Sequence, residues 1–199
     1  MNLALLDCHW WNEPARPDNP YHHQEIQFGR HLNFTLSSML LEVCPVRRVS
    51  SDIHRPQDRE TSMQLKARDC KGTDVALETH FNNAPPSWHG FLVEVKRGDP
   101  VSELLGSRLA ASLAEAIGHT VSVVQIPDPD YVTHRLFTIC PVPFVLVELG
   151  NLARPSTLKA FLNRGEFYFD VIRALVRGIK DFQEVHDGGV DTEAARGLS

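Results

Sequence analysis

Apolar residues are distributed along the chain in two alternating patterns, short continuous runs and longer stretches with helical spacing. The short runs predict β-strands. We expect strands at residues 3–6, 46–49, 75–81, 91–95, 121–126 and 143–149. The last run is strongly β-forming and apolar throughout, which places it in the centre of a sheet.

The longer stretches predict helices between these strands. In residues 101–117, Leu105, Leu109, Leu113 and Ile117 recur at every fourth position, which is typical of an amphipathic helix. The same reasoning predicts helices at residues 24–43, 60–71 and 155–182. Residues 184–199 contain two adjacent glycines and few apolar side chains, so we expect a flexible C-terminal tail.

Strands and helices alternate along most of the chain, a pattern that predicts an α/β fold. We expect three layers (αβα), with a central mixed, mostly parallel sheet and helices on both faces. The chain has 199 residues, enough for one substantial core. No internal repeat or linker divides it, so residues 1–183 are predicted to form a single domain.

Composition narrows the possible functions. The apolar fraction of 42% and charged fraction of 23% are ordinary for a globular protein, and the net charge of −5 argues against a nucleic-acid partner. No apolar run reaches the roughly 18–20 residues that span a bilayer, so we expect no membrane partner. The four cysteines are widely spaced, which favours reduced thiols, most of them buried, over a disulfide framework.

Polar residues at strand ends carry the candidate chemistry. His9 follows the first predicted strand, His80 ends the third, and Glu148 lies near the end of the most apolar one. In open α/β sheets, sites form just outside the carboxyl ends of the strands. A single histidine there is more often structural than a ligand. Glu148 is more informative, because an isolated buried carboxylate costs several kcal/mol; a functional acid is favoured, and a structural salt bridge is the alternative.

These residues lie within motifs that resemble the zinc-dependent N-acetylmuramoyl-L-alanine amidases of the amidase 3 type. The resemblance covers roughly residues 3–182. That family has an Asp-x-Gly-His-Gly element, a Glu at the start of a helix, a Ser-x-His-x-Asn-Ala element, a Gly-led strand and a Pro-x-x-Leu-Val-Glu-x-Gly-Phe element. The matching segments here are Leu6–Trp10, Glu25 with the helix that follows it, Glu78–Ala84, Gly90–Val95 and Pro143–Leu152, and Arg68 also fits.

The resemblance implies a zinc ion held by His9, Glu25 and His80, with Glu148 as the catalytic carboxylate. Three nitrogen and oxygen ligands plus water are typical of an open catalytic zinc site. Cys8 and Trp10 replace the two glycines that flank the histidine in the family's first element. Because neighbouring strand residues face opposite sides, we expect Cys8 to point away from the metal.

Several other residues are candidates for this site. Asn82, His134 and Arg135 are candidate substrate-binding residues; Asn82 is equally well explained as a turn-former, and His134 and Arg135 as solvated loop residues. His22 and His23, just before Glu25, are alternative groups near the metal.

The first functional hypothesis is an amidase that cuts the lactyl–L-Ala bond of peptidoglycan, with the stem peptide as its substrate, as in an endolysin. The alternative is a zinc peptidase or deacylase acting on another N-acyl amino acid or peptide. A non-catalytic binding module is a third possibility, which retention of all four key residues argues against. The N-terminus does not resemble a secretory signal. We therefore expect synthesis in the cytoplasm and action at the cell wall after lysis or another route of export.

Overall fold

The structure is a computed structural model that describes residues 1–9, 19–50, 58–126 and 135–196. Its strands are β1 (Leu3–Asp7), β2 (Val46–Val49), β3 (Val75–Asn82), β4 (Phe91–Lys96), β5 (Ser122–Ile126) and β6 (Phe144–Asn151). Its helices are α1 (His22–Met39), the short 3-10 helix η1 (Leu40–Glu42), α2 (Arg59–Asp69), α3 (Pro100–Ile117), α4 (Arg135–Ile139), α5 (Pro155–Asn163) and α6 (Glu166–Arg196).

The strands form one six-stranded sheet in the order β2-β1-β3-β6-β4-β5. Every neighbouring pair is parallel except β4 and β6, which are antiparallel. Strand β6 has neighbours on both sides and is almost entirely buried, as expected for the most apolar run. The prediction of a mixed, mostly parallel sheet is therefore confirmed.

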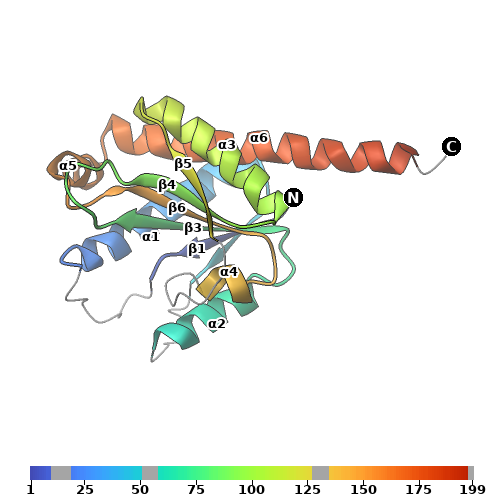
Figure 1. Cartoon of the computed structure of the whole chain (residues 1–199), viewed down its shortest axis with the longest axis horizontal. Helices are drawn as coiled ribbons and strands as arrows, with labels where there is room; N and C mark the ends of the chain where they lie inside the picture. The colour runs from blue at the N-terminus through green and yellow to red at the C-terminus, as the bar shows by residue number, and fades with distance from the viewer. Residues whose placement is uncertain (10–18, 51–57, 127–134, 197–199) are drawn as a thin grey trace.

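Helices cover both faces of the sheet (Figure 1). A layer of apolar side chains lies between the sheet and the helices on each face. On one face, side chains such as Leu77, Val93 and Val147 pack against α1, α3 and α6. On the other face, Ala76, Phe144 and Leu146 pack with apolar residues of α2 and α4. This arrangement confirms the three-layer αβα prediction. We call these two sides the α3/α6 face and the α2/α4 face.

Local sequence signals set the helix boundaries. Helix α2 begins after Asp58, whose carboxylate accepts a hydrogen bond from the Thr61 N–H. Helix α3 begins after Asp99, which accepts from the N–H groups of Val101 and Ser102, and it ends at Gly118 in a left-handed conformation.

The single helix predicted for residues 155–182 is wrong, because the chain breaks it into α5 and α6. Arg164 is the break: it has a φ of 45°, a left-handed value that a non-glycine residue rarely adopts and that ends α5. Helix α6 then continues to Arg196, through most of the segment predicted as a flexible tail. Figure 1 shows its C-terminal part extending beyond the sheet. The separation of a domain at 1–183 from a mobile tail stays a prediction.

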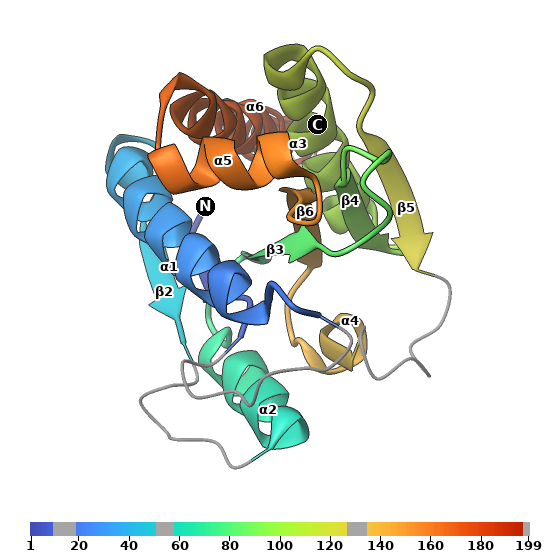
Figure 2. The same cartoon turned by 90° about the vertical axis from the view of Figure 1, so that its left-hand side faces the viewer.

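The carboxyl ends of β1, β3 and β6 lie at one edge of the sheet, where α1 and α5 also begin (Figure 2). The amino end of the antiparallel strand β4 lies at the same edge. We call this the carboxyl edge. Within the described residues, no helix is both long and apolar enough to cross a membrane.

Helices α3 and α6 pack so closely that a side chain at Gly178 would collide with the α3 backbone. A Cβ atom there would lie 3.0 Å from the Cα of Leu109 and 3.1 Å from the carbonyl oxygen of Arg108. Gly178→Ala is therefore expected to destabilise the fold by about 1–3 kcal/mol, as overpacking does. Urea unfolding measures the change.

Gly188, further along α6, is the matched control, because a Cβ atom there meets nothing within 4 Å. Gly188→Ala is expected to be neutral or stabilising by up to about 1 kcal/mol, since alanine favours the helix. Equal effects of the two substitutions would contradict the close approach of α3 to α6.

Candidate metal centre

The structure brings His9, Glu25 and His80 together at the carboxyl edge. Oε1 of Glu25 lies 3.3 Å from Nε2 of His9 and 3.0 Å from Nδ1 of His80. The two imidazole rings are 5.2 Å apart between centroids. His9 follows β1, His80 lies near the end of β3, and Glu25 lies in the first turn of α1. Three elements distant in sequence therefore bring both histidines to the same carboxylate oxygen of Glu25.

The carboxylate of Glu25 is buried and held from several sides. Asn19 donates its side-chain N–H to Oε2 at 3.1 Å, and the backbone N–H of Phe81 donates to Oε1 at 3.4 Å. Burial opposes the charge, but hydrogen bonds from His80 and His9 outweigh it and lower the pKa of Glu25 far below its ordinary value. Glu25 is therefore a fixed negative charge, suited to hold a cation.

His80 lies between two carboxylates. Its Nδ1 faces Glu25, and its Nε2 lies 3.5 Å from Oε2 of Glu78, on the same face of β3. Burial alone would lower the pKa of His80, but the hydrogen bonds to Glu25 and Glu78 raise it to about 10. A carboxylate on the far nitrogen fixes the orientation of a histidine ring, as it does behind many metal-binding histidines.

Glu78 is in turn neutralised by Lys66 of α2, and both side chains are almost fully buried. Nζ of Lys66 donates to Oε1 of Glu78 at 2.6 Å and to the carbonyl oxygen of Cys8 at 2.8 Å. Burial opposes the Glu78 charge, but Lys66 first and then His80 lower the pKa of this carboxyl to about 2. Lys66 thus links the end of β1 to the strand that carries His80.

The expectation that Cys8 points away from the centre is wrong. The ligand atoms of Cys8, His9 and Glu25 all lie within 4.8 Å of one another. Strand β1 ends at Asp7, so strand alternation no longer determines the direction of the Cys8 side chain. Its Sγ lies 3.8 Å from the carbonyl oxygen of Glu25 and fills the space left by Gly29, where a Cβ atom would come within 3.0 Å of it.

Glu148 lies beside His80, because the two residues are paired in the register of β3 and β6. Both side chains therefore lie on the α2/α4 face. One carboxylate oxygen, Oε2, is buried and has no hydrogen-bond partner within the described residues. Burial raises the pKa of Glu148 to about 8, against a smaller opposing effect of His80. This is the environment of a group that exchanges protons rather than one of a satisfied salt bridge.

The other residues predicted to lie near the site differ in their burial and in their contacts. His22 is buried, and its ring centroid lies 4.5 Å from that of His9, whereas His23 is exposed. Asn82 ends β3, and its carbonyl oxygen accepts a hydrogen bond from Leu152. Arg135 begins α4, with its Nε 3.4 Å from a Glu60 carboxylate oxygen. His134 and Trp10 lie outside the described residues.

Two buried polar features were missed from the sequence. The Lys66–Glu78 pair had a detectable signal, because Glu78 interrupts an apolar strand just as Glu148 does. Asn151 had none. Its side chain accepts from the N–H groups of Ala84 and Ala153 and donates to the carbonyl groups of Ala84, Pro85 and Trp88. It thereby fixes the two loops that follow β3 and β6.

The donor set fits a cation. A tetrahedral zinc ion with bonds of about 2.0–2.2 Å holds neighbouring nitrogen and oxygen donors roughly 3.3–3.6 Å apart. The separations of 3.3 and 3.0 Å from Glu25 to His9 and His80 are close to that spacing. The arrangement can therefore hold a metal ion, with a carboxylate of raised pKa beside it.

Comparison with solved structures identifies the fold. The CwlD amidase of Clostridioides difficile, solved in complex with the GerS lipoprotein, has a TM-score of 0.71 and 13% identity, over 92% of this chain and 98% of that one. The Mycobacterium smegmatis amidase Ami1 has a TM-score of 0.68 and 19% identity, over 92% and 96%. The protein has the fold of the N-acetylmuramoyl-L-alanine amidases.

The catalytic domain of the CD27L endolysin, which targets Clostridia difficile, has the same amidase fold, with a TM-score of 0.70 and 14% identity over 91% of this chain and 97% of that one. No family model and no curated protein sequence matches the chain. The resemblance inferred from short motifs is thus confirmed at the level of the fold.

The buried Lys66–Glu78 pair gives a stability prediction. Lys66→Met leaves the Glu78 carboxylate buried without its cation, so we expect a loss of about 3–5 kcal/mol in the free energy of unfolding. The double variant Lys66→Met/Glu78→Met removes both charges and is expected to lose less than the single variant. Urea unfolding of both proteins at pH 7 measures the difference.

Lys71→Met is the matched control, because Lys71 is exposed just beyond the end of the same helix. It is expected to change stability by less than about 0.5 kcal/mol. A Lys66→Met protein as stable as Lys71→Met would show that the pair does not neutralise a buried charge.

Proposed function

We propose that the protein is a zinc-dependent N-acetylmuramoyl-L-alanine amidase that hydrolyses the lactyl–L-Ala bond of peptidoglycan. The observation that carries this proposal is the convergence of His9, Glu25 and His80 at the carboxyl edge, with Glu148 paired beside His80. The amidase fold supports the substrate class, since the similar structures are N-acetylmuramoyl-L-alanine amidases and an endolysin domain.

His9, Glu25 and His80 would hold the zinc through Nε2, a carboxylate oxygen and Nδ1. His80 is preferred to Cys8 as the third ligand because its Nδ1 faces the same Glu25 oxygen as His9, whereas the Cys8 sulfur faces the Glu25 backbone. Three nitrogen and oxygen ligands leave a position open for water or substrate. A bound zinc ion would supply Lewis acidity, polarising the amide carbonyl and lowering the pKa of water.

Glu148 would act as the general base and then as the general acid. Its carboxylate takes a proton from the attacking water as the water oxygen bonds to the amide carbon. It then gives a proton to the leaving nitrogen as the C–N bond breaks, which releases the lactyl carboxylic acid and the amino group of L-Ala. A pKa raised by burial suits both halves of this cycle, since the group must both gain and lose a proton near neutral pH.

Asn82, His134 and Arg135 are proposed to contact the substrate. Asn82 supports this best, because it ends the strand that carries His80, and within the described residues its side-chain amide makes no hydrogen bond. The replacement of family glycines by Cys8 and Trp10 keeps the alternative substrate open, a different N-acyl amino acid or peptide.

Zinc binding distinguishes the two possible ligand sets. His80→Ala is expected to lose stoichiometric zinc, whereas Cys8→Ala is expected to keep it, because only the histidine lies on the shared carboxylate oxygen. Metal analysis after dialysis against trace zinc measures both. The reverse pattern, with zinc lost from Cys8→Ala and kept in His80→Ala, would assign the site to Cys8, His9 and Glu25 instead.

Glu148→Gln tests the reaction. It is expected to keep zinc but to lower the release of soluble stem peptides from purified peptidoglycan by about 10²–10⁴-fold, the usual contribution of a general acid–base. Glu115→Gln is the control, because Glu115 is an exposed residue of α3 on the opposite face. Full activity of Glu148→Gln would refute its role. Zinc-dependent hydrolysis of N-acyl peptides without release from peptidoglycan would favour the alternative substrate.

A further inference from the structure

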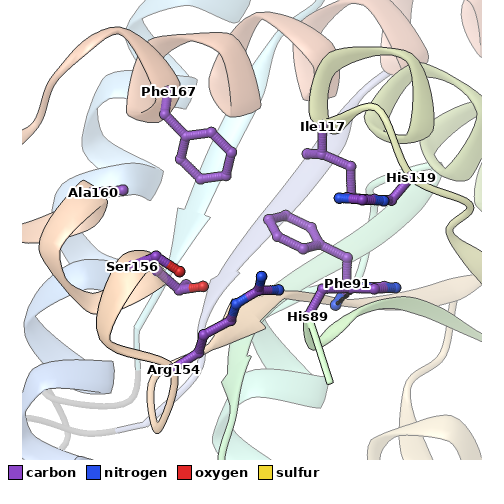
Figure 3. A pocket seen from close by; sticks show the side chains of 9 residues that line it. His89, Phe91, Ile117, His119, Arg154, Ser156, Ala160 and Phe167 are labelled. Carbon is purple, nitrogen blue, oxygen red and sulfur yellow. Dashed lines mark hydrogen bonds between the residues drawn. The ribbon is translucent and has the colours of Figure 1, made fainter. Parts of the chain in front are cut away.

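A second concave site lies on the α3/α6 face of the sheet, and the metal centre does not use it. It is a cavity of about 340 Å³ between the end of α3, the start of β4, helix α5 and the start of α6 (Figure 3). Cavities of this size are at the lower end of those that hold small organic ligands. Its lining residues are His89, Phe91, Ile117, His119, Arg154, Ser156, Thr157, Ala160 and Phe167.

None of the residues of the metal centre, His9, Glu25, His80 and Glu148, lines this cavity. Phe91 pairs with Leu149, and both belong to the apolar layer of the α3/α6 face. Glu148, one residue earlier in β6, faces the other side. The residues that line the cavity therefore have no role in the metal centre, and their polar groups are considered separately.

The polar lining is cationic and has no acid. The Arg154 side chain extends from the start of α5 into the cavity, between Ser156 and His89 in the view of Figure 3. Within the described part of the chain, no carboxylate pairs with Arg154, and none lines the cavity. A guanidinium that faces a cavity without a counter-ion is suited to bind a carboxylate through two parallel hydrogen bonds.

Two further groups offer hydrogen bonds. The Phe91 N–H donates to Nδ1 of His89 at 3.0 Å, so Nε2 carries the proton of the neutral ring and is a donor. Burial, with His119 and Arg154 nearby, lowers the pKa of His89, so the ring is neutral at pH 7. Thr157 is only 8% exposed, lines the cavity and carries a hydroxyl that can donate a hydrogen bond.

The rest of the lining is apolar. Phe91 and Phe167 meet edge to face, with ring centroids 6.3 Å apart, and Ile117 and Ala160 also line the cavity. The site therefore has one fixed positive charge, neutral donors and an aromatic wall. One charge matches a monoanion better than a phosphate dianion.

The loops around the cavity are fixed before any ligand binds. Asn151 connects the loop that precedes His89 to the one that leads to Arg154, and its N–H donates to the His89 carbonyl oxygen at 3.0 Å. A fixed arrangement of donors lowers the entropic cost of binding.

We propose that this cavity is a second ligand site, which binds a small organic monocarboxylate whose apolar group packs against Phe91 and Phe167. Arg154 holds the carboxylate, and His89 and Thr157 donate further hydrogen bonds to it. The site shares no residue with the metal centre, and the proposal does not rest on the proposed amidase activity.

Phenylacetate is the probe, because it combines a carboxylate with one aromatic ring. Binding is measured by backbone amide chemical shifts during titration of the chelator-treated protein, so that no metal competes for the carboxylate. We expect shifts at the cavity, around His89, Arg154 and Phe167, and weaker binding of both acetate and uncharged 2-phenylethanol. Binding of 2-phenylethanol as tight as that of phenylacetate would overturn the proposal, as would shifts confined to other regions.

Arg154→Gln is expected to weaken phenylacetate binding by at least about tenfold, the effect of losing a charged hydrogen bond. Arg97→Gln, at the opposite end of β4, removes the same charge on the surface and is expected to leave binding unchanged. Thr157→Val keeps the shape of the side chain and is expected to weaken binding by roughly 2–10-fold. Equal affinities of the wild type, Arg154→Gln and Thr157→Val would refute the site.

Discussion

The parallel pairing of β1, β3 and β6 is the constraint on which the candidate metal centre depends. In this register, Asp7 of β1 pairs with Thr79, and His80 pairs with Glu148. Each strand thus delivers its polar residues to the carboxyl edge at the same height. A shift of one residue in β3 would turn His80 to the opposite face. The apolar residues that alternate along the strands fix the register, and so they also fix the chemistry.

The charges buried at this edge neutralise one another in a series of contacts that begins at Lys66 and ends at His9. Lys66 neutralises Glu78, Glu78 orients His80, and His80 shares the Glu25 oxygen with His9. Glu148 lies beside this series of contacts, and among the described residues its buried Oε2 has no hydrogen-bond partner. The groups proposed to hold a metal are thereby fixed as anions or oriented rings, while the neighbouring Glu148 carboxyl has a raised pKa. That division of roles is what separates a binding group from a proton-transfer group.

The sequence predicts those features that follow from the spacing of apolar residues, or from a polar residue that interrupts this spacing. All six strands and the helix of residues 101–117 follow from apolar spacing, and Glu148 follows from the cost of a carboxylate in an apolar run. What it does not predict depends on contacts between distant residues. Cys8 turns inward because β1 has already ended and Gly29 leaves room for its sulfur. Asn151 looks like an ordinary polar residue until five hydrogen bonds show that it connects two loops.

The error in the last helix shows why such contacts matter for function. Periodicity alone runs one helix through residues 155–182, because Leu158, Phe161 and Leu175 fit a single apolar stripe. The break at Arg164 instead sets α5 apart from α6, so that Ala160 and Phe167 both line the cavity with Arg154. The left-handed residue has a conformational cost of about 1–3 kcal/mol. A straight helix would carry residues 155–160 along a different path from the one that places them around the cavity, and the second site would not form.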